Sequence, residues 1–208
     1  MKKTSMNIPN TLSIIRCLLV PVFVVTLLFM GKMGIWGYIV PAAVYGITAF
    51  TDMLDGKIAR KYNLVTDFGK FIDPLADKFM VISSMITILV WRLLDNDKTF
   101  ALVFVWVVLI ILLRELGVTS LRLVVAGKSG IVVAASMLGK IKTVSQMIGT
   151  VVFILEPAIP IVINHSAVSF VCDNHILSYI AMAVMAFTTL FSGIDYLKAY
   201  MPYIDSNK

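Results

Sequence analysis

Residues 52–77 read DMLDGKIARKYNLVTDFGKFIDPLAD, a strongly charged stretch in a very apolar chain. The chain has 208 residues, of which 59% are hydrophobic and 14% charged, and its mean hydropathy is +0.92. Five of its twelve acidic residues are the aspartates of this stretch. A carboxylate within apolar helix is energetically unfavourable, so the cluster indicates a bound cation or a reaction.

The rest of the sequence predicts an all-α integral membrane protein that forms one domain over residues 1–208. A soluble domain carries about 25% charged residues, far more than this chain. Apolar runs of about 20 residues, the length that crosses a bilayer, recur along it. Glycines and short polar segments separate six predicted transmembrane helices, at 9–30, 35–60, 72–92, 99–126, 137–163 and 175–200.

The N-terminus has Lys2 and Lys3 before an apolar stretch, as signal peptides do. Arg16 interrupts that stretch and no small-residue cleavage site follows it, so we expect a retained first helix. Cys17 and Cys172 fall on opposite sides of the predicted membrane topology, which argues against a disulfide.

Basic residues predict the orientation in the membrane. Lys32, Arg92 and Lys98 lie in or beside the loops after the first and third predicted spans, and the other basic residues lie toward the opposite side. By the positive-inside rule, that opposite side is the cytoplasmic side of the cell membrane, and both termini are expected there. The net charge of +6 then suits anionic lipids and phosphorylated substrates, and no nucleic-acid partner is expected.

The carboxylate spacing predicts a metal site. Asp52 and Asp55 are three residues apart, and Asp73 and Asp77 are four apart, so each pair lies on one helix face. The short connection makes the two helices antiparallel neighbours, which lets the pairs converge. Oxygen donors without nearby histidine or cysteine suit Mg²⁺ or Mn²⁺ rather than zinc. The alternative is a set of ordinary juxtamembrane charges paired with neighbouring lysines and arginines.

Small residues accompany the carboxylates. Gly56 and Ala59 would let a bulky group approach the backbone, Gly69 would open the facing helix similarly, and Arg60 could bind phosphate oxygens in a forked geometry. Asp67 lies off both pairs, and we expect it to cap the next helix or to face solvent.

These residues resemble the signature of the CDP-alcohol phosphatidyltransferases, D-x-x-D-G-x-x-A-R, eight residues, then G-x-x-x-D-x-x-x-D. The eight fixed positions are filled by Asp52, Asp55, Gly56, Ala59, Arg60, Gly69, Asp73 and Asp77. The resemblance implies a six-helix membrane enzyme, usually a homodimer, with a cytoplasmic active site that binds CDP-diacylglycerol and two divalent metal ions. It also implies that Asp52, Asp55 and Asp73 hold the metals, and that Asp77 lies at the metal centre and acts as general base.

The alcohol acceptor is predicted from basic residues elsewhere. Arg114 could bind a phosphate or be held by Glu115 or an aspartate. Lys140 and Lys142 point about 200° apart on a helix, so one of them should be a membrane-surface lysine. So many cations favour an acceptor that already carries phosphate, such as sn-glycerol 3-phosphate. Residues 7–21, the Arg114–Glu115 pair and residues 139–147 are similar to the phosphatidylglycerophosphate synthase branch of the family.

Other functions remain open at this point. Within the family, the alternatives are cardiolipin synthesis and phosphatidylinositol phosphate synthesis. A prenyl-diphosphate transferase would need a second aspartate-rich motif, and a divalent-cation transporter often shows two similar halves, neither of which is visible.

Several polar residues have both a local and a ligand-binding interpretation. Asn10 could reach the nucleotide but more simply caps the first helix, and Thr51 could do so but more simply bonds back along its helix. Arg16 is expected to snorkel or to pair with an aspartate. His165 and His175 are too distant to share the metal, and Glu156 has no evident role.

Overall fold

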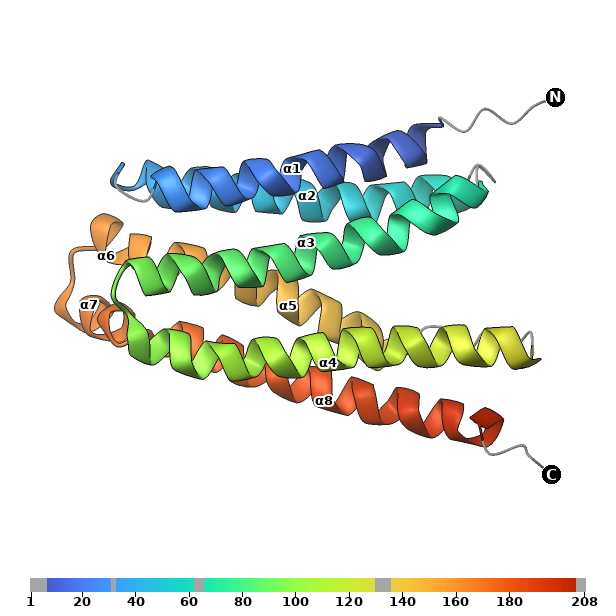
Figure 1. Cartoon of the computed structure of the whole chain (residues 1–208). Helices are drawn as coiled ribbons and strands as arrows, with labels where there is room; N and C mark the ends of the chain where they lie inside the picture. The colour runs from blue at the N-terminus through green and yellow to red at the C-terminus, as the bar shows by residue number, and fades with distance from the viewer. Residues whose placement is uncertain (1–6, 31–32, 62–65, 130–135, 205–208) are drawn as a thin grey trace.

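The computed structural model describes residues 7–30, 33–61, 66–129 and 136–204, and this part of the chain is a bundle of helices (Figure 1). The long helices run along its length in alternating directions. They are α1 (Ile8–Met30), α2 (Trp36–Lys61), α3 (Asp67–Leu94), α4 (Lys98–Ser129), α5 (Met137–Leu155) and α8 (Ile176–Ile204). The start of α1 and the end of α8 lie at the same end of the bundle. Three short helices lie at the opposite end: η1 (Glu156–Ala158), α6 (Ile159–Val162) and α7 (Ser166–Asp173). The predicted all-α architecture is confirmed.

Five of the described helical segments are long and apolar enough to cross a membrane, so the chain is a multi-pass membrane protein. They are Pro9–Phe29, Phe71–Leu94, Lys98–Gly127, Met137–Val162 and Ile176–Tyr203. The helix α2 is not among them, because glycine, tyrosine and Asp52 dilute its aliphatic residues. It nevertheless packs along α1 within the bundle (Figure 1). The sixth span and the cytoplasmic position of the termini stay predictions.

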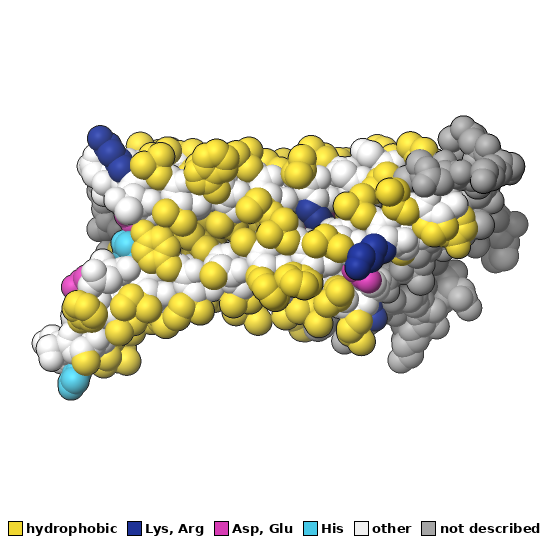
Figure 2. Space-filling view, turned by 90° about the horizontal axis from the view of Figure 1, so that it is seen from below, with side chains coloured by type: hydrophobic (Ala, Val, Ile, Leu, Met, Phe, Trp, Pro, Cys, Tyr) yellow, Lys and Arg dark blue, Asp and Glu magenta, His cyan; other side chains and the backbone are white. Residues whose placement is uncertain are grey.

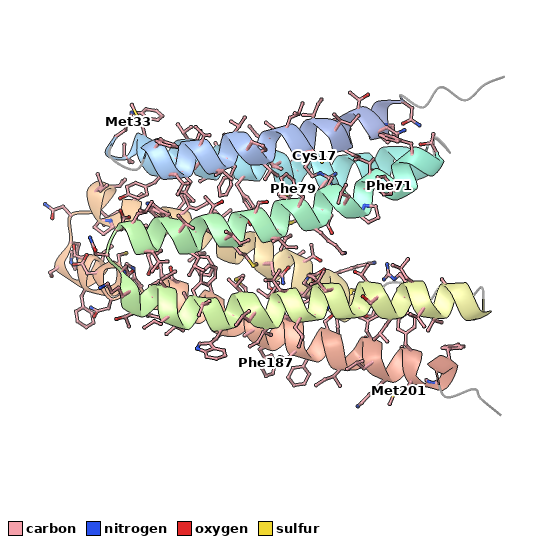
Figure 3. The ribbon with its side chains drawn as sticks, in the orientation of Figure 1. Cys17, Met33, Phe71, Phe79, Phe187 and Met201 are labelled. Atoms are coloured by element: carbon pink, nitrogen blue, oxygen red, sulfur yellow. The ribbon has the colours of Figure 1, made fainter. Side chains whose placement is uncertain are left out.

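The face of the bundle seen in Figure 2 is apolar over most of its length, as a lipid-facing surface must be. Large side chains such as Phe71, Phe187 and Met201 project away from the bundle (Figure 3). Between the helices, aromatic side chains pack edge to face, as Phe104 does on Phe153 with ring centroids 5.0 Å apart. Because lipid supplies no hydrophobic drive between helices, this close packing is what holds them together.

Two helix starts differ from the sequence prediction. The side chain of Asn7 accepts a hydrogen bond from the backbone N–H of Asn10 (3.1 Å), so Asn7 caps α1 and Asn10 lies inside it. Thr66 caps α3 by accepting from the backbone N–H of Gly69 (3.0 Å), so Asp67 is the first residue of the helix rather than its cap. The side chain of Asp67 is outside the described part of the structure.

Glu156, which had no evident role in the sequence, caps the start of α8 at the end of the bundle opposite the start of α1. Its two carboxylate oxygens accept the backbone N–H groups of Leu177 (2.9 Å) and Ser178 (3.0 Å) at the start of α8. These N–H groups have no partner within the helix, so Glu156 acts as a buried cap supplied from η1. Between the last two predicted spans, Ser166–Asp173 forms the short helix α7.

Candidate active site

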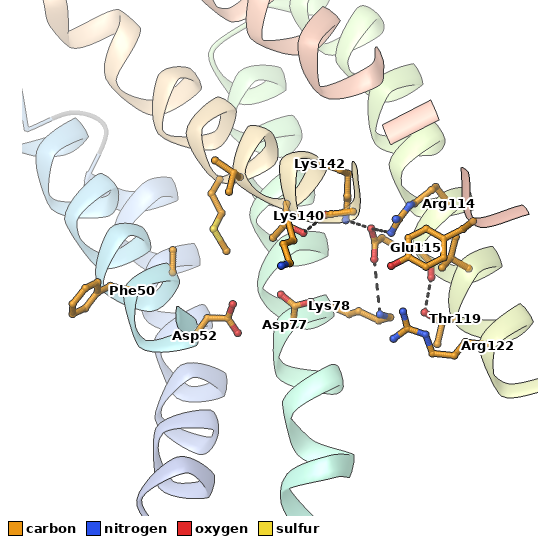
Figure 4. Close-up of a pocket in the computed structure, with 17 residues that line it drawn as sticks. Phe50, Asp52, Asp77, Lys78, Arg114, Glu115, Thr119, Arg122, Lys140 and Lys142 are labelled. Atoms are coloured by element: carbon orange, nitrogen blue, oxygen red, sulfur yellow. Dashed lines mark hydrogen bonds and ion pairs between the residues drawn. The ribbon is translucent and has the colours of Figure 1, made fainter. Parts of the chain in front are cut away.

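A cavity of about 680 Å³ opens between α2, α3, α4, α5 and α8 (Figure 4). Acidic residues of α2, α3 and α4 and basic residues of α3, α4 and α5 line it together. They are Asp52, Asp77 and Glu115, and Lys78, Arg114, Arg122, Lys140 and Lys142. This excess of basic over acidic side chains within an apolar bundle suits a ligand that carries several negative charges.

The structure brings Asp52 of α2 and Asp77 of α3 to the same cavity (Figure 4). The prediction that these two helices pack as direct neighbours is wrong for the described residues, because both instead pack on α1 and α5. Asp73 lies one turn before Asp77 on α3, where its Oδ1 is 2.5 Å from the hydroxyl of Ser13. Asp55 lies on α2, but its side chain is outside the described part of the structure. Among the described residues, no three histidine, cysteine, aspartate or glutamate side chains are grouped closely enough to hold a metal ion.

The donor set nevertheless fits a hard divalent cation. The described carboxylates of Asp52, Asp73 and Asp77 offer oxygen atoms only, and Mg²⁺ binds through one or two carboxylates together with water and substrate phosphate. The basic residues across the cavity could hold that phosphate.

The helix α1 supplies polar partners to this carboxylate group. Arg16 is fully buried and forms an ion pair with Asp52, which confirms the expectation that it pairs with an aspartate. The contact of Ser13 with Asp73 was not predicted. The sequence signal for it was a serine between Asn10 and Arg16 in a mostly apolar helix.

Glu115 is the centre of the charge network on the opposite wall. It pairs with the buried Lys142, accepts from Nη1 of Arg114 at 3.2 Å, and lies 3.8 Å from Nζ of Lys78. Nη2 of Arg114 donates to Ser192 of α8 at 2.5 Å. Of the alternatives open for Arg114, the structure shows the pairing with Glu115. The pairing of Glu115 with Lys142 was not foreseen.

The two lysines of α5 differ as predicted. Lys142 is buried against Glu115, whereas Lys140 is exposed at the edge of the cavity. Arg122 also lines the cavity and was missed by the sequence analysis. It lies two turns after Arg114 on α4. Both guanidinium groups lie over the ring of Tyr196, that of Arg122 at 5.9 Å and that of Arg114 at 5.1 Å from the ring centroid.

Some of the residues predicted to bind CDP-diacylglycerol lie on the part of α2 whose side chains are outside the described structure. They are Gly56, Ala59 and Arg60. Thr51 donates to the backbone carbonyl of Thr48 (2.7 Å), the local bond that was expected.

Asn10 and Gly69 have a packing role. The Asn10 side chain is buried and donates to the Thr66 hydroxyl (2.8 Å). A Cβ on Gly69 would come within 2.7 Å of Oδ1 of Asn10, so glycine permits the close approach of α1 and α3. Nucleotide contacts by Thr51, Asn10 and Gly69 stay predictions.

The described residues form a helical membrane bundle with acidic and basic side chains around a shared cavity, which suits phosphorylated substrates held at the membrane. The family model for CDP-alcohol phosphatidyltransferase matches residues 6–193, and the chain belongs to that family.

Several relatives within this family are similar to the chain over most of its length. A protein of Bacillus subtilis (strain 168) named CDP-diacylglycerol–glycerol-3-phosphate 3-phosphatidyltransferase is 38% identical over 199 residues, which cover 91% of this chain and 93% of the relative. A protein of the same name from Rickettsia bellii is 33% identical over 97% of this chain and 99% of its own length. A probable phosphatidylglycerophosphate synthase of Mycobacterium tuberculosis is 33% identical over 92% of this chain and 80% of its own length.

Proposed function

We propose that this protein transfers the phosphatidyl group of CDP-diacylglycerol to sn-glycerol 3-phosphate, forming phosphatidylglycerophosphate and CMP. The observation that carries the proposal is that Asp52 and Asp77 line the same cavity as several basic side chains. The carboxylate side suits the diphosphate with its metal, and the basic side suits an acceptor that already carries phosphate. Relatives with this activity in their names match nearly the whole chain.

Four carboxylates, Asp52, Asp55, Asp73 and Asp77, would hold the metal, for which we propose two Mg²⁺ ions, with Mn²⁺ as the alternative. When bound, these ions neutralise charge on the diphosphate and on the departing CMP. Glycine and alanine at positions 56, 59 and 69, together with Arg60, Asn10 and Thr51, are proposed to shape the CDP-diacylglycerol side of the site.

The chemical step is an attack by an acceptor hydroxyl on the phosphatidyl phosphorus. A new oxygen–phosphorus bond forms, and the bond from that phosphorus to the bridging oxygen of the diphosphate breaks, so that CMP leaves. Asp77 is the proposed general base that takes the hydroxyl proton. Its position on the cavity wall, opposite the basic side chains, supports this role.

Basic residues would orient the acceptor. Arg114, Lys140 and Lys142 were predicted to bind its phosphate, and the cavity adds Lys78 and Arg122. Because Glu115 already holds Arg114 and Lys142 in place, we propose that these two form a fixed wall. The more exposed Lys140 and Arg122 would then close on the incoming phosphate.

We also propose a topology and an assembly. The helix α2 is the sixth span, both termini and the cavity face the cytoplasm, and the chain forms a homodimer in the cell membrane. The start of α1 and the end of α8 lie at one end of the bundle, as an even number of spans requires (Figure 1).

Acceptor competition tests the proposed function. The purified protein in detergent would receive CDP-diacylglycerol and Mg²⁺ with sn-glycerol 3-phosphate, phosphatidylglycerol, inositol phosphate or no acceptor, and CMP release would be measured. We expect stimulation by sn-glycerol 3-phosphate above all others. Stimulation by phosphatidylglycerol or inositol phosphate instead would identify a different member of the family.

A further inference from the structure

Three residues of α1 follow one another at three-residue steps and are almost completely buried. The exposed fraction is 1% for Asn10 and 0% for both Ser13 and Arg16. A three-residue step turns the direction of a helical side chain back by about 60°. The row therefore turns from α3, which Asn10 and Ser13 contact, toward α2, which Arg16 contacts.

Asn10, Ser13 and Arg16 each contact either an aspartate of the site or the helix that carries such an aspartate. Asn10 donates to Thr66, the cap of α3, and thereby joins α1 to the helix of Asp73 and Asp77. Ser13 contacts Oδ1 of Asp73 directly, and Arg16 pairs with Oδ1 of Asp52.

The hydroxyl of Ser13 has only one proton to donate. Its oxygen is 2.5 Å from the Asp73 carboxylate and 3.1 Å from the backbone carbonyl of Pro9. Since a charged acceptor forms the shorter and stronger hydrogen bond, the proton belongs on the Asp73 side. This bond fixes the rotation of the Asp73 carboxylate.

Both contacts leave the carboxylates able to coordinate a cation. A carboxylate has two oxygen atoms and about four acceptor positions. Asp52 lines the cavity while it is paired with Arg16. Polar partners placed behind metal-binding carboxylates fix their orientation and raise the affinity for the metal.

We propose that Ser13 and Arg16 are positioning residues that hold Asp73 and Asp52 in the orientation in which they bind the divalent cation. The inference rests on the proposed function for the identity of the metal-binding carboxylates. Neither residue touches the substrate; both act through an aspartate.

The test measures metal binding without catalysis. Mn²⁺ alone is added to the purified full-length protein in detergent, and free Mn²⁺ is measured by electron paramagnetic resonance. Ser13→Ala should weaken Mn²⁺ binding roughly 10- to 100-fold, the range found when such supporting contacts are removed. Arg16→Lys keeps the charge but loses the forked geometry, and it should weaken binding in the same direction.

Ser84→Ala is the matched control. Ser84 is equally buried and lies on α3, but its hydroxyl donates to the backbone carbonyl of Val81 (2.9 Å). The control should retain the Mn²⁺ affinity of the unaltered protein. In CMP release, Ser13→Ala should raise the Mg²⁺ concentration for half-maximal rate by the same factor as its loss of Mn²⁺ affinity. The rate at saturating Mg²⁺ should change little.

The outcomes separate this inference from the proposed function. Equal Mn²⁺ affinity in Ser13→Ala and Ser84→Ala would overturn the positioning role, and so would an unaltered protein that binds no Mn²⁺ but releases CMP. Loss of Mn²⁺ affinity in Ser13→Ala and in Arg16→Lys, but not in Ser84→Ala, supports it. An unaltered protein that binds Mn²⁺ but releases no CMP in the presence of sn-glycerol 3-phosphate would overturn only the proposed function.

Discussion

Replacing Glu115 by glutamine should destabilise the protein strongly, because it removes the negative charge that joins three basic side chains. The side chains of Lys142 and Arg114 are 5% and 12% exposed, so water cannot replace Glu115 as their partner. Lys78 is farther away, at 3.8 Å, and a quarter exposed, so its pairing adds at most about 1 kcal/mol.

The loss of stability in Glu115→Gln comes mainly from the broken pair with Lys142. Breaking a buried ion pair from one side destabilises a protein by about 3–5 kcal/mol. Arg114 contributes less, because its second nitrogen keeps the hydrogen bond to Ser192. For a chain of this length, each kcal/mol lowers the midpoint of thermal unfolding by about 2–4 °C, so we expect a fall of roughly 6–20 °C.

Thermal unfolding in detergent, followed by intrinsic fluorescence, measures this change. The double variant Glu115→Gln/Lys142→Met should recover at least half of the loss, because it removes both charges of the buried pair. Lys140→Met, on the same helix but exposed, is the control and should change stability by less than about 0.5 kcal/mol. A fall of less than about 3 °C in Glu115→Gln, or additive effects in the double variant, would refute the reasoning.

Three further predictions concern the packing and the chemistry. Gly69→Ala should lower stability by about 1–3 kcal/mol through the overlap with Asn10, and Asn10→Ser should relieve it; a stable single variant would contradict the close approach of α1 and α3. Glu156→Gln should weaken the cap of α8 and lower the free energy of unfolding by about 1–3 kcal/mol, while the rate of CMP release in the folded fraction stays unchanged; a slower reaction would place Glu156 in the catalytic machinery. Asp77→Asn should reduce kcat at least about 100-fold with little change in CDP-diacylglycerol binding, and equal losses in both would count against its role as base.

Features that depend on local sequence were predicted well. The length of the apolar runs predicts the long helices, and the spacing of Asp52, Asp73 and Asp77 along the chain indicates a common site. The structure places Asp52 and Asp77 at one cavity, and it does so through the packing of α2 and α3 on α1 and α5 rather than through direct contact between the two helices.

Features that depend on packing between distant segments were not predicted. The contact of Ser13 with Asp73 spans 60 residues, and the pair of Lys142 with Glu115 spans 27. Neither follows from helical periodicity, because periodicity tells which face a residue occupies but not which helix lies against that face. The caps of α1 and α3 were misplaced for a related reason, since Asn7 and Asn10, or Thr66 and Asp67, are both suitable cap residues.

Mass spectrometry of the lipid product tests the central claim most directly. The purified protein would be incubated with CDP-diacylglycerol, Mg²⁺ and isotopically labelled sn-glycerol 3-phosphate, beside the Asp77→Asn variant. We predict labelled phosphatidylglycerophosphate and an equal amount of CMP from the unaltered protein, and almost none from the variant. CMP release without labelled lipid, or full product from Asp77→Asn, would contradict the account.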